Sequence, residues 1–459
     1  MSNSDSKAVL AFRTHVWDAQ IELLARRMLA AAPHARFIII ADETNGILET
    51  NSFEKLAHSS DFSDIGLPDY PVGNTLWYNG EYPLYRMRAA FPNATAYGMI
   101  EFDVSVTANL TPIFNAIESG HADLVAHDIH EVEPNWHFFH SIEPHFEIRM
   151  QAMIHALFVS PRAVDYMYQR RLNIANNVSA GLSDVVSWPF CEGFVPSAIK
   201  EMQDAQIEEL RNFVKLPYYV FGTPLHLCDP RSSEPESIVH PVLSGKRFIS
   251  KRMDFDDPAD IFDQNSELSK QLQYYLPSEY VKGLFDGFNR KTRSRLPEFV
   301  RFALANGWLD TASFFNISIG CSSDQSSVSA YSRSTQTFED ARGGNNGNIG
   351  GGYGFWTAEE LDPYWQVDLE NICRIERVTI HNFLGARDQC TNLAILISSD
   401  QTNWSLVATK LDNAPFGGAD GTPYHFDFPM PPRARYCRIQ LVGHGALHLD
   451  EIEVFGLPD

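Results

Sequence analysis

Two carboxylates separated by one residue, Glu101 and Asp103, follow an apolar run in the first half of the chain. Side chains two positions apart on an extended backbone point to the same side, so both carboxylates can face one divalent cation. Magnesium and manganese prefer oxygen ligands and keep their other positions for water and phosphate. The pair therefore predicts an Mn²⁺ or Mg²⁺ site, although the same spacing of acids also arises by chance.

The segments around these acids alternate between strand-like and helix-like patterns. Apolar runs such as 36–43 and 95–106 predict buried strands, and residues 15–33 carry apolar side chains at helical spacing. This alternation predicts a mostly parallel α/β sheet covered on both faces. Ligands of such sheets bind beyond the carboxyl ends of the strands. Four acids fall at these ends, namely Asp42, Glu101, Asp103 and Asp128.

The remaining sequence changes character twice. Residues 253–312 show amphipathic patterns interrupted by proline, which predicts a helical linker or subdomain. Residues 313–459 show short alternating runs between stretches rich in Ser, Gly and Asn, which predicts an all-β sandwich. We therefore expect a multidomain chain, with an α/β domain at 1–252, a helical part at 253–312 and a sandwich at 313–459.

Composition excludes several classes of protein. The 459 residues include 36 Lys and Arg against 58 Asp and Glu, a net charge of −22, and a broad nucleic-acid-binding surface needs clustered basic residues. No run approaches the roughly 20 apolar residues of a membrane span. The N-terminal residues lack a secretory signal pattern. We expect a cytoplasmic location, with peripheral attachment to an inner membrane left open, and the oligomeric state stays open as well.

The C-terminal runs resemble a known family. They include YWQVDL at 364–369, SSDQTNW at 398–404 and EIEVFG at 451–456. Their order is similar to that of the discoidin-like, coagulation factor 5/8 type C domain, whose bacterial members often bind carbohydrate. The resemblance implies a jelly-roll sandwich and a glycan as partner.

The same resemblance implies two sites in the sandwich. A structural Ca²⁺ would be held by loop oxygens and an acid near the last strand, which assigns Glu451 with Asp340. Sugar contacts would come from His381, Arg387 and Asp388. The alternatives are a solvated turn and an ordinary surface loop, because fold alone does not fix a ligand.

The N-terminal pattern, with Asp42 after the second strand and EFDVSV at 101–106, resembles a GT-A glycosyltransferase. The resemblance implies a nucleotide-sugar donor and Mn²⁺ or Mg²⁺ at an Asp-x-Asp-like motif. Here Glu101 stands where the family more often has Asp, which leaves the need for metal open. The departing nucleoside diphosphate gains negative charge, which a divalent cation neutralises.

The resemblance also implies roles for other polar residues. His240 would complete the metal site and Lys246 would contact the diphosphate. Arg13 and Thr14 would lie over the nucleotide, Asp42 would bond the base or ribose, and Arg86 would meet phosphate.

An inverting transfer needs a general base near the acceptor hydroxyl. The resemblance to GT-A enzymes implies Glu192, at the head of an expected helix, as this base, with Asp184 and Asp128 as the next candidates. A retaining enzyme needs no such base. The four histidines of 127–140 raise a zinc hypothesis, but their spacings match no zinc motif, and we expect this segment to line the acceptor side.

These inferences predict a glycosyltransferase that moves a sugar from a nucleotide-sugar donor to a glycan acceptor, in bacterial surface-polysaccharide synthesis, while the sandwich holds glycan. One alternative is a lectin-like protein without catalysis. A second is a sugar nucleotidyltransferase, which predicts a glycine-rich loop after the first strand. The segment AFRTHVWDAQ at 11–20 contains no glycine.

Overall fold

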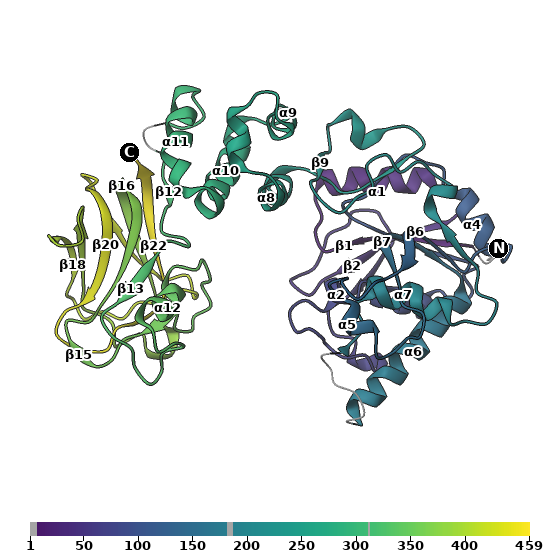
Figure 1. The fold of residues 1–459 in the computed structure, drawn as a ribbon, viewed down its shortest axis with the longest axis horizontal. Helices are drawn as coiled ribbons and strands as arrows, with labels where there is room; N and C mark the ends of the chain where they lie inside the picture. The colour runs from purple at the N-terminus through teal and green to yellow at the C-terminus, as the bar shows by residue number, and fades with distance from the viewer. Residues whose placement is uncertain (1–6, 181–186, 311–312) are drawn as a thin grey trace. The chain divides into compact units, whose positions relative to one another are not determined.

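The computed structural model describes residues 7–180, 187–310 and 313–459 (Figure 1). Contacts divide the chain into two compact units, Met1–Ser244 and Gly245–Asp459, which are described separately below. Within the described ranges, no helix combines the length and apolar character that crossing a membrane requires. The six cysteines are free thiols.

The first unit is built on a seven-stranded sheet with the order β3-β2-β1-β4-β7-β6-β8. Its strands are β1 (Val9–Thr14), β2 (Arg36–Asp42), β3 (Lys55–His58), β4 (Tyr97–Glu101), β6 (Leu124–Glu131), β7 (Met150–Val159) and β8 (Ile207–Glu209). The pairs among β1 to β4 are parallel, and so is β6 with β8. Only β7 runs antiparallel to its neighbours. The predicted α/β sheet is confirmed, and it is mixed.

Helices cover both faces of this sheet (Figure 1). Helices α1 (Ala19–Ala31) and α4 (Thr111–Glu118) pack on one face. The other face carries α2 (Thr75–Tyr78), α3 (Tyr82–Ala90), α5 (Phe139–Ile142), α6 (Pro161–Ser179) and α7 (Cys191–Lys200). Alternate residues of β1 point to the two cores, as the period of a strand requires.

Short strands close the first unit around the end of β4. The strand β5 (Ser105–Val106) pairs with β10 (Ile238–Val239), and β9 (Leu225–His226) pairs with β11 (Val242–Leu243). The backbone N–H of Val242 donates to the carbonyl of Asp103 at 2.7 Å. These pairings bring the chain near residue 240 to the carboxyl end of β4.

The second unit begins with helices α8 (Gly245–Phe255), α9 (Glu267–Leu272), α10 (Pro277–Lys291) and α11 (Leu296–Ala305). The helical character expected for this part is present, and these helices share their unit with the sandwich. The boundaries at 252 and 312 stay predictions.

The sandwich is antiparallel along the order β12-β22-β16-β20-β17-β18. Those strands are β12 (Phe315–Asn316), β16 (Tyr364–Asn382), β17 (Leu393–Ser398), β18 (Ser405–Lys410), β20 (Arg433–Leu441) and β22 (His448–Pro458). Shorter elements flank them, namely β13 (Ser323–Gln325), α12 (Thr337–Ala341), β14 (Phe355–Trp356), β15 (Glu360–Leu361), β19 (Tyr424–Asp427) and β21 (His444–Gly445). Trp365, Val367 and Leu369 alternate into the core, as their spacing predicts.

Candidate functional site

A cluster of charged side chains lies at the carboxyl ends of β1 and β4. The parallel register pairs Arg13 with Glu101. The Arg13 Nη1 donates to Glu101 Oε1 at 2.7 Å, and its Nη2 donates to the carbonyl of Leu76 at 2.5 Å. Burial alone would raise the pKa of Glu101, but Arg13 and nearby histidines hold this pKa below its usual value. Glu101 is therefore an anion in a fixed orientation.

Asp103 and His240 face each other beside this ion pair. The His240 Nε2 lies 3.7 Å from Asp103 Oδ2, and its Nδ1 lies 2.9 Å from the carbonyl oxygen of Val220. Because a carbonyl oxygen only accepts, Nδ1 carries the hydrogen and Nε2 is the atom turned toward the carboxylate. A second group that fixes the other ring nitrogen is typical of histidines that bind metal.

The predicted metal ligands fit a divalent cation in part. Asp103 and His240 present an oxygen and a nitrogen to one point, whereas Glu101 is engaged by Arg13. Across the described residues, no group of three or more His, Cys, Asp or Glu side chains is arranged to hold a metal ion. A cation here would take its remaining ligands from water and from phosphate oxygens.

His155, on β7, is a member of this cluster that the sequence analysis missed. Its ring lies 3.9 Å from the ring of His240 and 5.1 Å from that of Phe221. Burial, followed by the neighbouring His240, lowers the pKa of His155 to about 4, so its ring is neutral near pH 7. The only signal in the sequence was one histidine inside an apolar strand, a pattern that usually marks a core residue.

Glu192 lies in the first turn of α7, near enough to Glu101 to feel its charge. Burial, and then the charge of Glu101, raise the pKa of Glu192 to about 8. The two carboxylates are thus close enough to interact, although they are far apart in sequence. A carboxyl group whose pKa lies near the working pH has the property that general acid–base catalysis needs.

An aromatic cluster stands beside the first turn of α7. Phe138 and Phe190 stack at 3.8 Å, and Trp136 and Trp77 lie 5.7 and 6.0 Å from Phe138. Trp136 and Phe138 belong to the segment 127–140 that was expected to line the acceptor side, and this role stays a prediction. Trp77 was not predicted as part of it.

The other predicted nucleotide contacts have structural partners. Thr14 is buried, and its hydroxyl bonds the carbonyl of Val16. Asp42 caps its own turn through the N–H of Thr44 at 3.0 Å.

Arg86 forms a two-point ion pair with Asp64 at 2.7 and 2.5 Å. Lys246 is exposed and belongs to the second unit, Gly245–Asp459, so no placement at this site follows for it. Asp184 lies outside the described residues. Asp128 is half exposed near the end of β6, beside His130 at 3.5 Å.

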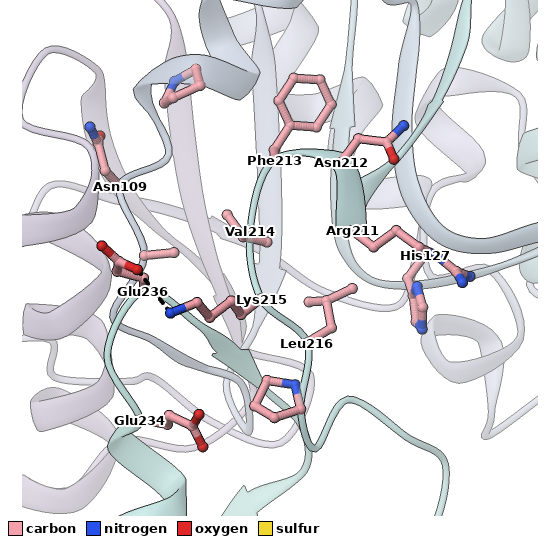
Figure 2. Close-up of a pocket in the computed structure, with 13 residues that line it drawn as sticks. Asn109, His127, Arg211, Asn212, Phe213, Val214, Lys215, Leu216, Glu234 and Glu236 are labelled. Carbon is pink, nitrogen blue, oxygen red and sulfur yellow. Dashed lines mark hydrogen bonds and ion pairs between the residues drawn. The ribbon is translucent and has the colours of Figure 1, made fainter.

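A pocket of about 880 Å³ lies in the same unit but is lined by other residues. Figure 2 shows Arg211, Lys215, Glu234 and Glu236 around it, with Lys215 paired to Glu236 at 2.9 Å. His127 also lines this pocket, and its ring contacts Tyr219 at 5.3 Å. None of the residues that the sequence predicted for catalysis or donor binding lines it.

In the sandwich, the two predicted calcium ligands accept hydrogen bonds from different segments of the chain. Asp340 is buried and accepts N–H groups from Gln325, Arg333 and Trp356 at 3.0, 2.6 and 2.9 Å. These bonds fill three of the roughly four acceptor positions of the carboxylate, and a calcium role for Asp340 stays a prediction.

Glu451 is fully buried and accepts the backbone N–H groups of Asn346 and Gly347 at 3.2 and 2.9 Å. Burial raises the pKa of Glu451 to about 8. A calcium ion there remains a prediction.

The predicted sugar contacts separate into one buried and two exposed residues. His381 is only 5% exposed, and its Nε2 lies 3.0 Å from Glu453 Oε2. The side chain of His381 therefore lies inside the sandwich. Arg387 and Asp388 are exposed, and Arg387 pairs with Asp420 at 2.6 Å.

An aromatic shelf lies in the same unit, which we define as Tyr331, Tyr353, Trp356 and Phe383. The rings of Tyr331 and Tyr353 lie 4.8 and 5.1 Å from that of Trp356, and Phe383 lies 5.7 Å from Tyr353. His448 stacks under Trp356 at 4.2 Å. The sequence did not predict this shelf, because its residues are dispersed over about fifty positions.

Three solved structures are similar to part of the chain, each at low identity. The chain is similar to a fucose-binding module of Streptococcus pneumoniae, with 24% identity over 32% of this chain and 99% of that chain (TM-score 0.25). It is similar to a fucolectin from the serum of striped bass, Morone saxatilis, with 20% identity over 32% and 50% (TM-score 0.28). It is also similar to a family 32 carbohydrate-binding module from C. perfringens in complex with galactose, with 15% identity over 31% and 99% (TM-score 0.26).

No curated protein matches the chain. The N-terminal resemblance to GT-A glycosyltransferases stays a prediction. The family model of the F5/8 type C domain matches residues 320–452. The discoidin-like resemblance of this part of the chain is thereby confirmed.

Proposed function

We propose that the first unit transfers a glycosyl group from a nucleotide-sugar donor to a glycan acceptor, and that the F5/8 type C domain binds glycan. One observation carries the first proposal. Arg13, Glu101, Asp103, Glu192 and His240 come from four distant segments and meet at the carboxyl ends of two parallel strands. This edge is where α/β sheets bind their ligands.

Each residue has a role that its contacts allow. Glu192 accepts the proton of the acceptor hydroxyl as that oxygen attacks the sugar. Arg13 fixes the orientation of Glu101 through their ion pair, and it would lie over the nucleotide of the donor. Asp103 and His240 would hold a divalent cation, which when bound supplies charge neutralisation for the departing diphosphate.

The donor site is tested by thermal unfolding of the full chain with a panel of nucleoside diphosphates, with and without MnCl₂. A ligand at about 100 times its Kd adds about 2.7 kcal/mol to the free energy of unfolding. We expect one nucleotide to raise the Tm in the presence of Mn²⁺, and Asp103→Ala to abolish the rise. A rise that does not depend on metal would contradict the role of Asp103 and His240. No rise with any nucleotide would remove the transferase and favour a lectin-like protein.

Glycan binding by the second unit is supported by the family match and by the aromatic shelf. Sugar rings expose C–H faces that pack against aromatic side chains, and polar groups at the edge fix their orientation. Arg387 and Asp388 are exposed and can act as such groups. A lectin-like protein without catalysis is the second candidate, because these observations favour it equally.

The shelf is tested by the Trp356→Ala substitution on an oligosaccharide array. We expect the array signal that depends on the sandwich to fall about tenfold or more, because the central ring of the shelf is lost. The Phe338→Ala chain is the control, since Phe338 is exposed on α12 but contributes no ring to the shelf. An unchanged signal for Trp356→Ala would show that glycan binds elsewhere.

A further inference from the structure

Trp77 is an exposed tryptophan near the catalytic cluster, by which we mean Arg13, Glu101, Asp103, Glu192 and His240. Its side chain lies on α2 and is 62% exposed, which is unusual for so large an apolar residue. Its indole packs against Phe190 and Phe138, with ring centres 5.3 and 6.0 Å away. Helices α2, α5 and α7, which carry or flank these rings, lie together in Figure 1. The indole is thus supported on one side and open to solvent on the other.

Hydrogen bonds link the backbone around Trp77 to Arg13 on one side and to the first turn of α7 on the other. The carbonyl of Leu76 accepts from Arg13, the partner of Glu101, at 2.5 Å. The carbonyl of Trp77 accepts from the thiol of Cys191, next to Glu192, at 3.8 Å. Trp77 therefore lies at the rim of the site, between the ion pair and the expected general base.

Buried polar contacts hold this rim in place. Trp188 Nε1 donates to Asn79 Oδ1 at 2.8 Å, and the hydroxyl of Tyr78 donates to the carbonyl of Trp188 at 3.0 Å. The fully buried Arg171 bonds Glu81 at 2.7 Å and the carbonyl of Pro189 at 2.8 Å. The segment that carries Trp77 and the segment that precedes Glu192 are thus joined by buried hydrogen bonds.

Gly80 lies between Arg13 and Cys191. A Cβ at Gly80 would lie 3.3 Å from Arg13 Nη1 and 3.4 Å from Cys191 Sγ. The backbone of residue 80 therefore forms the floor between Arg13 and the first turn of α7.

We propose that Trp77 is the platform on which a neutral sugar ring of the acceptor stacks. The acceptor role rests on the proposed transferase. The C–H face of a pyranose covers the open side of the indole, and a ring hydroxyl turns toward Glu192. Arg13 and Glu101 pair with each other at 2.7 Å, so neither charge is left open for a charged glycan and the site suits a neutral one. An apolar protein segment is the competing occupant, and the experiment separates the two.

The test uses the full chain carrying Trp356→Ala, so that binding at the aromatic shelf is reduced, and an array of neutral oligosaccharides as the probe. We expect the remaining signal to fall at least about tenfold when Trp77→Ala is added, and to persist with Trp77→Tyr. Ile47→Ala, which removes another exposed apolar side chain of the same unit, is the control. The Tm of each variant shows that it is folded, because exposed substitutions change stability little.

Each outcome separates this inference from the proposed function. Array binding that survives Trp77→Ala, or that persists equally with Trp77→Leu, overturns the platform. A nucleoside diphosphate that raises the Tm while the Trp356→Ala chain binds no glycan also overturns it, and leaves the transferase standing. Glycan binding that depends on Trp77 without any nucleotide effect supports the platform and removes the transferase.

Discussion

Replacing Arg171 with methionine is expected to lower the free energy of unfolding of the first unit by about 3–5 kcal/mol. Arg171 and Glu81 form an ion pair at 2.7 Å in which both side chains are 0% exposed, and the guanidinium lies 3.7 Å from the centre of the Phe194 ring. The substitution leaves the carboxylate of Glu81 buried without its partner. Urea unfolding followed by tryptophan fluorescence measures the change.

Two controls accompany this prediction. The double variant Glu81→Gln/Arg171→Met has no buried charge and is expected to recover much of the lost stability. Arg36→Met breaks an exposed pair with Glu54 and is expected to cost less than about 1 kcal/mol. If Arg171→Met costs no more than Arg36→Met, the pair does not hold the structure together.

Glu192→Gln is expected to lower kcat by about 10²–10⁴-fold, because the amide cannot accept the acceptor proton. Burial and the charge of Glu101 raise the pKa of Glu192 to about 8. The active form is the carboxylate, so the kcat/KM of the unmodified chain should rise with pH and level off above about 8. Glycosyl transfer measured with the donor identified by thermal unfolding tests both expectations. Glu201→Gln, at the other end of α7, should stay within about twofold.

The same shift affects stability with a defined sign. Folding raises the pKa of Glu192 from 4.5 to about 8, so the folded state binds this proton more tightly than the unfolded state. The resulting stabilisation is present below pH 4.5 and is lost as the pH rises toward 8. Above that pH, Glu192→Gln should be more stable than the unmodified chain.

In the kinetic experiment, a kcat of Glu192→Gln that changes less than tenfold would point to a retaining mechanism or another base.

The sequence predicted the part of the site that follows from strand ends. Glu101 and Asp103 follow an apolar run, and an α/β sheet places such acids at its ligand-binding edge. Glu192 was predicted from the resemblance to GT-A enzymes together with its place at the head of an expected helix. The antiparallel direction of β7 was not predictable, because an apolar run carries no information about strand direction.

The missed residues depend on contacts between distant segments. His155 occurs as one polar ring in an apolar strand, and only pairing of β4 with β7 brings it toward Glu101. The shelf around Trp356 forms only when several loops meet. The resemblance places His381 among the sugar contacts, but its side chain is buried, and the close approach of Gly418, whose Cβ would lie 2.8 Å from His381 Cβ, covers it.

The narrow fit at Gly80 limits how this chain can be altered in the laboratory. A Cβ at position 80 would already contact Arg13 at 3.3 Å and Cys191 at 3.4 Å, so a library that introduces larger side chains there would displace Arg13 along with the binding surface. Trp77 projects outward and can be exchanged without moving its neighbours. A search for variants that accept new sugars should therefore randomise position 77 and keep residues 78–81 constant.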